Sequence, residues 1–589
     1  MKKLLYKVAG LMLIALPVVA MTSCSDDYME EINTDTTKTP EINPNAQLTT
    51  ALLQTYGDFG MMDAYRCYVT GFTQYFAGGW NVSNYAGAVH YDNDMTRTIW
   101  EELYNVGIKN AVDAIEKTKE TSPNLNAILR IHRVYLMAVL TDTYGDVPYF
   151  DAGQALYGGS ATPAYDKQED IYNDFFKELD ECIKVLQNDK NTDAVTGDVT
   201  AYGGDVKAWA KYANSLRMRY AMRISDVAPE KAKAEFEKAV AASCGYISNN
   251  GENATITYID GPFTLYDGAR DLDFRVNALG EMLYGQDSDS PTFVSATLFN
   301  KLNDTNDPRL YRICRHYLNP KRSAVKADDA WNVDVTEEVV AYENGDKGDG
   351  PHPCDIGAAW WHNWVNAPAN EDIPTLARLV NMYPEVGFDQ SNYNARMMRP
   401  FLSIQFEKAE CPGILMTSAE VKFLLAEAIL KGWNVGDGSE AEFYFKSGIR
   451  EAMEMLNQYY KIKAITEEEI QAYLDANTIK NIDKEAAKEA INYQAWILHL
   501  MNPAEGWANL RRSGYPTLEN RYNYPRWTSD FTYDDDDLTT PVRLKYPNLE
   551  AKYNKANYEK ALQNLGGTDN WHHRVWWDTE ADHVTPLNP

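Results

Sequence analysis

Apolar side chains recur at helical spacing in two blocks of the chain, about 99–243 and 417–500. From Ile99 to Ile115 they return every three or four residues, which is the pattern of one helix face. Ser122-Pro123 ends that helix, and a second is predicted from Leu125 to about Tyr144. Further helices are predicted at 169–186, 206–224 and 231–242, and then at 418–430, 441–456, 467–474 and 486–500. Short turns between such helices are typical of tetratricopeptide-like pairs.

The segment between the two blocks, about 245–412, has a different pattern. It is rich in Gly, Pro, Asp, Asn and aromatic residues and has little periodicity. Irregular stretches of this length in a compact protein usually carry function. No Pro/Gly/Ser-rich linker divides the chain, so 45–589 is predicted to be a single, mainly α domain.

The N-terminus has the pattern of an export signal. Lys2, Lys3 and Lys7 precede an apolar stretch at 8–20 that is too short to span a bilayer. It ends in MTSC at 21–24, which resembles a bacterial lipobox with Cys24 as the lipidated residue. We therefore predict a signal peptide at 1–23 and a lipidated flexible tether at 24–44, whose composition is polar. An ordinary signal peptide followed by a chance cysteine is the alternative.

Charge and cysteine content restrict the partners. Removal of the three lysines of the signal changes the formal charge from −29 to −32. Such an acidic surface disfavours nucleic acid and anionic membranes, and it favours neutral or cationic ligands. The sequence contains no CxxC pair, so it gives no support for a zinc site, although a disulfide or two remains open.

Six short segments carry distinctive local signatures. They are YGDVPY at 144–149, ANSLRMR at 213–219, NDPR at 306–309, ExxFLLAEA at 420–428, RxxYP with Glu550 and Asn554 from 543 onward, and WWD at 576–578. Together, and in this order, they resemble the SusD/RagB family of outer-membrane lipoproteins over essentially the whole chain. Physically they are helix stops, turns and buried helix faces, so we interpret them as determinants of the fold rather than as a site.

The resemblance implies a SusD-like scaffold of four tetratricopeptide-like helix pairs with a large, loop-rich, ligand-facing half. It also implies a lipoprotein on the outer face of a Bacteroidetes outer membrane, and Ser25-Asp26-Asp27 after the lipobox resembles the matching export signal. The implied partner is a SusC-like TonB-dependent outer-membrane barrel, to which the lipoprotein passes its ligand. Family members mostly capture glycans, and some capture peptides.

Aromatic residues in the irregular segments are the candidates for ligand contact. A sugar ring offers an apolar face to an aromatic side chain, and its hydroxyl groups need polar partners. We single out nine residues: Trp80, Asn81, Asn84, Tyr85, Tyr266, Trp331, Trp360, Trp361 and Trp364. Packing of Trp80 onto the helices is an equal alternative for that residue, and the adjacent Trp576 and Trp577 are expected to close the core.

Metal and enzyme chemistry have weak support. Asp534 to Asp537 and the oxygen-rich segment 343–350 offer calcium ligands, but the EF-hand spacing is missing, so we interpret both as solvated acidic loops and expect no cofactor. HExxH, GxSxG and phosphate-loop motifs are missing from the sequence. A glycoside hydrolase needs only two suitably spaced carboxylates, and it stays an alternative beside peptide capture and a purely structural scaffold.

Overall fold

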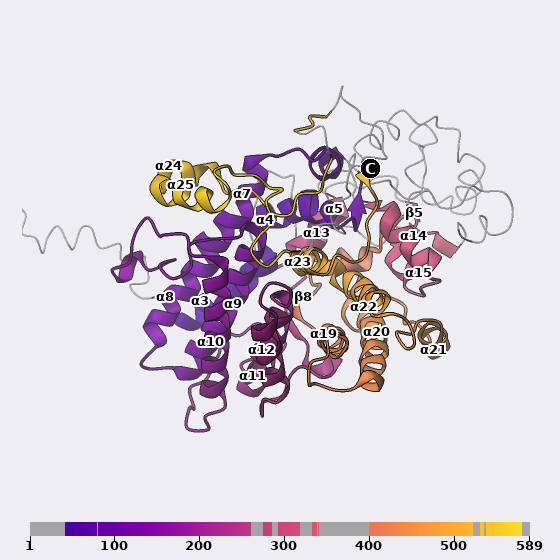
Figure 1. The fold of residues 1–589 in the computed structure, drawn as a ribbon, viewed down its shortest axis with the longest axis horizontal. Coiled ribbons are helices and arrows are strands. Elements are labelled where there is room, and N and C mark those ends of the chain that lie inside the picture. The colour runs from indigo at the N-terminus through magenta and orange to yellow at the C-terminus, as the bar shows by residue number, and fades with distance from the viewer. Residues whose placement is uncertain are drawn as a thin grey trace, which may run out of the picture. The chain divides into compact units, whose positions relative to one another are not determined.

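The protein is described from a computed structural model, which is mainly helical and confirms the predicted fold class (Figure 1). The described residues are 42–78, 80–260, 275–285, 293–318, 333–337, 340, 400–521, 531–534 and 538–579. Residues 44–589 form one compact unit. The predicted signal peptide and the lipid-bearing Cys24 lie outside the described residues.

The first helical block follows the predicted pattern. The helix expected from Ile99 consists of α7, a π-helical segment η3 and α8, and the next, α9, has Pro in its first turn and ends at Gly145 with φ 88°. Its elements are α7 Asn93–Glu102, η3 Leu103–Ile108, α8 Lys109–Thr118, α9 Pro123–Tyr144, α10 Gln168–Leu186, α11 Val206–Arg223 and α12 Pro229–Val240. The predicted helices at 169–186, 206–224 and 231–242 are confirmed to within a few residues.

The second block is confirmed as well. It contains α19 Ser418–Leu430, α20 Gly438–Tyr460, α21 Glu467–Ala476 and α22 Lys484–Leu498, followed by η11 His499–Met501. Asp437 and Thr466 begin α20 and α21 with reciprocal capping boxes, which satisfy amide groups at the helix start. Helices α9 and α10, α11 and α12, and α19 and α20 pack as pairs, and α11 joins the two blocks by packing on α19 (Figure 1).

Several helical segments were not among the predicted helices. They are α3 Pro44–Gly57, α4 Phe59–Ala64, η1 Tyr65–Val69, α5 Thr70–Phe72, α6 Trp80–Val82, η2 Ser83–Gly87, η4 Ala155–Tyr157, η5 Asn250–Glu252, α13 Ala278–Gly285, α14 Ala296–Asp304, α15 Leu310–Ile313, η10 Ile404–Phe406, α23 Pro503–Ser513, α24 Asn548–Tyr553 and α25 Lys555–Asn564. The C-terminal half of α3, 51–57, is buried on all sides, so no solvent-facing side marks its period. The region 245–412 is therefore less irregular than predicted, because its described parts include three α-helices.

Short strands connect this middle region to the scaffold. An antiparallel sheet has the order β1-β3-β7-β4, and β2 pairs with β8 and β5 with β6. The strands are β1 Phe76–Ala77, β2 Ala254–Ile256, β3 Phe293–Val294, β4 Cys314–Arg315, β5 Tyr317–Leu318, β6 Val333–Asp334, β7 Phe401–Leu402 and β8 Gly413–Met416. Segments from four distant parts of the sequence thus form the sheet beside η2, which carries some of the predicted ligand residues.

The family-like signatures occupy the core, as predicted for fold determinants. Arg309 makes a two-pronged ion pair with Asp307 of the NDPR turn, at 2.9 and 2.5 Å. Trp577 is buried and donates its indole N–H to Asp142 at 2.7 Å, so it closes the core over α9. Buried charges of this kind persist in proteins when each is paired and hydrogen-bonded.

Candidate functional site

Three of the predicted ligand residues share one face of a short helical segment. Asn81 lies in α6 and Asn84 and Tyr85 lie in η2, at the spacing of i, i+3 and i+4 that places side chains together on a helix. All three are partly buried, whereas the neighbouring Val82 and Ala86 are buried. Asn81, Asn84 and Tyr85 therefore form one accessible polar and aromatic face, which we call the amide–tyrosine face. Trp80 begins α6, and its side chain lies outside the description.

A glycine fixes this face to the scaffold. A Cβ atom on Gly71 of α5 would lie 2.4 Å from the Cβ of Ala86 in η2, which is closer than real atoms approach. Because Gly71 has no side chain, the backbone of α5 can lie directly against the side chain of Ala86 in η2. The contact holds η2, and with it Asn84 and Tyr85, in one orientation.

The environment of Tyr85 suits hydrogen bonding to a neutral ligand. Its ring centroid lies 5.2 Å from that of Tyr68, and it stacks on His90 at 6.3 Å with 10° between the planes. Burial, with a contribution from the negative charge of Asp92, raises the pKa of Tyr85 to about 12. The phenol is therefore protonated at neutral pH and can donate to an oxygen. The side-chain amide of Asn84 makes no hydrogen bond within the described part of the chain, so it too can serve a ligand.

The start of the aspartate run lies beside the same loop. The carboxylate of Asp534 accepts hydrogen bonds from the backbone N–H of Tyr91 at 2.6 Å and from Nδ1 of His90 at 3.0 Å. This aspartate therefore helps hold the loop that follows η2. Asp535 to Asp537 and the segment 343–350 lie outside the described residues, so their interpretation as solvated acidic loops stays a prediction.

The other aromatic candidates belong to parts of the chain that the structure does not describe. Tyr266, Trp331, Trp360, Trp361 and Trp364 all lie outside the described residues. Among the described cysteines, Cys67, Cys182, Cys244, Cys314 and Cys411 are free thiols. The part of the site that the structure brings together is thus the amide–tyrosine face alone.

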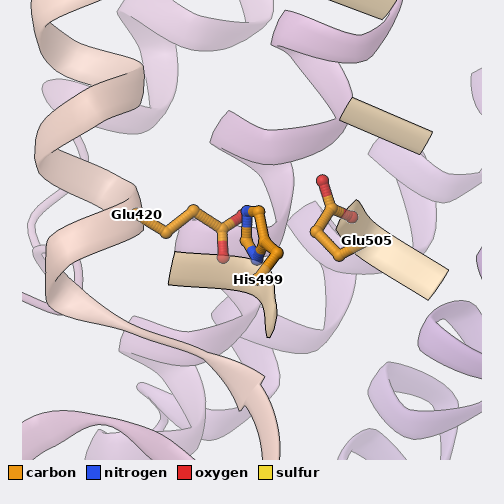
Figure 2. Close-up of side chains that lie close together, drawn as sticks. All are labelled: Glu420, His499 and Glu505. Carbon is orange, nitrogen blue, oxygen red and sulfur yellow. The ribbon is translucent and has the colours of Figure 1, made fainter. Parts of the chain in front are cut away.

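A cluster of ionisable side chains lies elsewhere, between α19, η11 and α23. Glu420, His499 and Glu505 converge there, and their ligand-type atoms lie within 4.8 Å of one another (Figure 2). Arg219 of α11 donates to both oxygens of Glu420 at 2.6 Å, and Arg223 donates to Glu505 at 2.6 Å. The geometry superficially fits a metal site, because two carboxylates and an imidazole face one point.

The electrostatics of this cluster favour a structural ion network. Burial by itself would raise the pKa of Glu505, but Arg223 and Arg219 outweigh it and lower the pKa to about 2. Burial lowers the pKa of His499, so the imidazole is neutral at pH 7. Two guanidinium groups already balance the two carboxylates, and a divalent cation would be repelled by both. We therefore interpret the cluster as a connection between α11, α19 and α23.

A cavity of about 520 Å³ is a feature that the sequence did not reveal. It lies between α15, β5, η10 and the turn after α20, and charged, polar and apolar side chains line it. Its residues come from four separate stretches of the chain, so no local motif marks them. The one local signal is the pair Lys461 and Lys463 in an acidic sequence.

The fold and the accessible face define a class of protein: a helical-repeat scaffold that presents polar and aromatic side chains to a ligand. Two family models match the chain, one described as "Starch-binding associating with outer membrane" over 36–331 and one as "Susd and RagB outer membrane lipoprotein" over 385–578. The chain belongs to the SusD/RagB family of outer-membrane nutrient-binding lipoproteins. Both descriptions name the outer membrane, and the first also names starch binding.

Solved structures support the same assignment. A Bacteroidetes AC2a SusD-like protein is 37% identical with a TM-score of 0.81, and the match covers 92% of this chain and all of that one. A chitin-binding protein is 29% identical with a TM-score of 0.70, covering 91% and 100% of the two chains. A SusD homologue from Bacteroides uniformis is 25% identical with a TM-score of 0.66, covering 92% and 100%.

Two further findings concern curated proteins and the helices of this chain. No protein with a curated description matches the chain. Within the described residues, every helix is too short or too polar to cross a bilayer.

Proposed function

We propose that this protein captures oligosaccharides at the outer surface of the outer membrane and passes them to a SusC-like TonB-dependent transporter. The lipid on Cys24 would hold it there, and the ligand would bind at the amide–tyrosine face together with Trp80. The observation that carries the proposal is the grouping of Asn81, Asn84 and Tyr85 on one accessible face. Amides and a phenol beside aromatic rings are the groups that a neutral sugar requires.

The comparisons support a glycan rather than another nutrient. One matching family description names starch, and one similar structure is of a chitin-binding protein. Peptide capture is the second candidate, as in RagB-like members of the family, and a glycoside hydrolase is the third. The remaining sequence candidates, Tyr266, Trp331, Trp360, Trp361 and Trp364, are proposed as further contacts.

Isothermal titration calorimetry of the purified protein with chito- and malto-oligosaccharides tests the proposal. We expect one of the two series to bind, and Asn84→Ala to weaken that binding by roughly five- to tenfold, because one net hydrogen bond contributes about 1 kcal/mol. Trp80→Ala should weaken it at least about tenfold through loss of an aromatic contact. Asn188→Ala, on the exposed turn after α10, is the matched control and should leave binding unchanged.

Three outcomes would contradict the proposal. Binding that is unaltered by both Asn84→Ala and Trp80→Ala would place the sugar elsewhere. Binding of peptides from a protein digest, with no response to either oligosaccharide series, would favour peptide capture. New reducing ends released from the oligosaccharide by the purified protein would establish a hydrolase.

A further inference from the structure

The 520 Å³ cavity is separate from the amide–tyrosine face and is unusually rich in cations. Its lining includes Arg312, Arg315, Lys461 and Lys463, against three carboxylates. The formal charge of the lining is therefore +1, in a chain whose formal charge is −29. At physiological ionic strength charges are screened within about 8 Å, so an ion inside the cavity responds mainly to this lining.

The two arginines are tied to carboxylates of the wall. Arg315 of β4 pairs with Asp334 of β6 through two nitrogens at 2.6 and 2.8 Å. Arg312 donates to Glu469 at 2.8 Å, and its Nε is buried without a hydrogen-bond partner. These pairs neutralise Asp334 and Glu469, and they leave a donor on Arg312 unused.

The two lysines have no carboxylate partner among the described residues. Lys461 and Lys463 are exposed on the turn after α20, while Ile462 between them is buried. The alternation directs both lysines to the open side of the turn. The contact of Lys461 is a long one, 3.4 Å from its Nζ to the carbonyl oxygen of Gln458. The two ammonium groups thus outnumber the one unpaired carboxylate of the lining, Glu337.

The backbone at Lys461 is a second, independent observation. Lys461 closes α20 in the left-handed conformation, with φ 57° and ψ 21°. Glycine is the usual residue at such a position, because a side chain there is strained. A lysine at this position costs stability, and strain of this kind is typical of functional sites. The side-chain amide of Gln405 and the ring of Tyr311 in the same cavity provide the polar and apolar contacts that a sugar needs.

We propose that this cavity binds the anionic group of an acidic saccharide, a carboxylate or a sulfate on a sugar ring. Lys461 and Lys463 contact the anion, and Gln405 binds a hydroxyl group. The proposal rests on the proposed function only in that the ligand is a saccharide, since it concerns a different set of residues. The proposed ligand is anionic, a class that the net negative charge of the whole chain would by itself disfavour.

The test is calorimetry on the purified full-length protein with three probes. They are trigalacturonic acid, its neutral methyl ester and a sulfated galactose oligosaccharide. We expect at least one anionic probe to bind, the methyl ester to bind at least tenfold more weakly than the acid, and anionic binding to weaken in 0.5 M salt. Lys461→Gly combined with Lys463→Ala should reduce anionic binding at least tenfold, and a glycine at position 461 suits the backbone there, so the fold is retained.

Two controls separate this proposal from general charge effects and from the neutral-sugar site. Lys190→Ala combined with Lys207→Ala removes the same charge from exposed positions elsewhere and should leave anionic binding unchanged. Asn84→Ala should likewise leave it unchanged. Failure of both anionic probes to bind overturns the proposal, as does an equal loss in the two lysine double variants. Neither result affects neutral oligosaccharide binding at the amide–tyrosine face, so the two proposals fail separately.

Discussion

At the scale of single residues, two helix ends that require a left-handed backbone carry different residue types. Gly432 follows α19 with φ 81°, and a side chain there would meet no atom within 4 Å. Lys461 follows α20 with a similar φ but carries a long side chain. Two helix ends of the same protein thus meet the same backbone requirement with different residues, and only one of them follows the usual preference for glycine.

Exchange of the two residue types should have opposite effects on stability. Lys461→Gly is expected to raise the free energy of unfolding by about 1 kcal/mol, because glycine adopts a left-handed backbone without strain. Gly432→Ala should lower it by a similar amount, since it introduces strain without a clash. Urea unfolding followed by circular dichroism measures both. A fall in stability with Lys461→Gly would show that the lysine side chain itself stabilises the turn.

At the scale of secondary-structure elements, buried arginine–carboxylate pairs connect helices that are far apart in the sequence. Glu427 of α19 accepts hydrogen bonds from Arg512 of α23 at 2.6 and 2.8 Å. Both side chains are nearly inaccessible to solvent. Burial by itself would raise the pKa of Glu427, but Arg512 lowers it to about 2. This pair and the Arg219–Glu420 pair bind α19 to its neighbours on two sides.

Glu427→Gln should therefore destabilise the protein by about 3 kcal/mol, because it leaves the guanidinium of Arg512 buried without a counter-charge. In the unaltered protein the folded pKa lies below the unfolded value near 4.3. The contribution of Glu427 is present above about pH 5 and is lost as the pH falls towards 2. Urea midpoints at pH 7 and pH 3 should thus differ less in the variant than in the unaltered protein.

The matched control is a surface pair of the same chemistry. Arg450 donates to both oxygens of Glu467 at 2.6 and 2.9 Å, but Glu467 is 66% exposed. Glu467→Gln is expected to cost less than about 1 kcal/mol, since solvent screens the pair. Equal costs for the two substitutions would argue against the connecting role of Glu427.

At the scale of the whole molecule, the proposed lipid anchor at the N-terminus is separate in sequence from the helical scaffold. Residues 44–589 form one compact unit, and membership of an outer-membrane lipoprotein family is established by two matching models. Lipid on Cys24 is proposed to hold that unit at the membrane, since two acyl chains give stable anchoring where one gives marginal binding.

Cys24→Ser should release the protein from the membrane fraction. Detergent phase partition of cell extracts is the measurement: we expect the unaltered protein in the detergent phase and the variant in the aqueous phase. Mass spectrometry of the N-terminal peptide should find acyl chains on Cys24 only in the unaltered protein. A wild-type peptide that begins before residue 24 and carries no lipid would contradict the proposed anchor.

Helix patterns were predictable from sequence where one face of a helix meets solvent. Helices such as α10 and α20 have alternating buried and exposed faces, and their sequences show the corresponding period. In contrast, the C-terminal half of α3 is buried on all sides, and Ala561 is the one buried residue of α25, so neither has a clear apolar stripe. Periodicity disappears when a helix is buried or exposed on all sides.

The family resemblance, the helical scaffold and the choice of Asn81, Asn84 and Tyr85 as candidates came from the sequence alone, because these depend on residues close together in the chain. The sequence predicted a loop there, and the fold places the three residues on one helical face. Only the tertiary structure decided that Glu420, His499 and Glu505 are balanced by Arg219 and Arg223. It alone brought Arg312, Arg315, Lys461 and Lys463 around one cavity. Such groupings join segments that are far apart in the chain, as Arg219 and Glu420 are, and neither spacing nor composition records which distant segments meet when the chain folds.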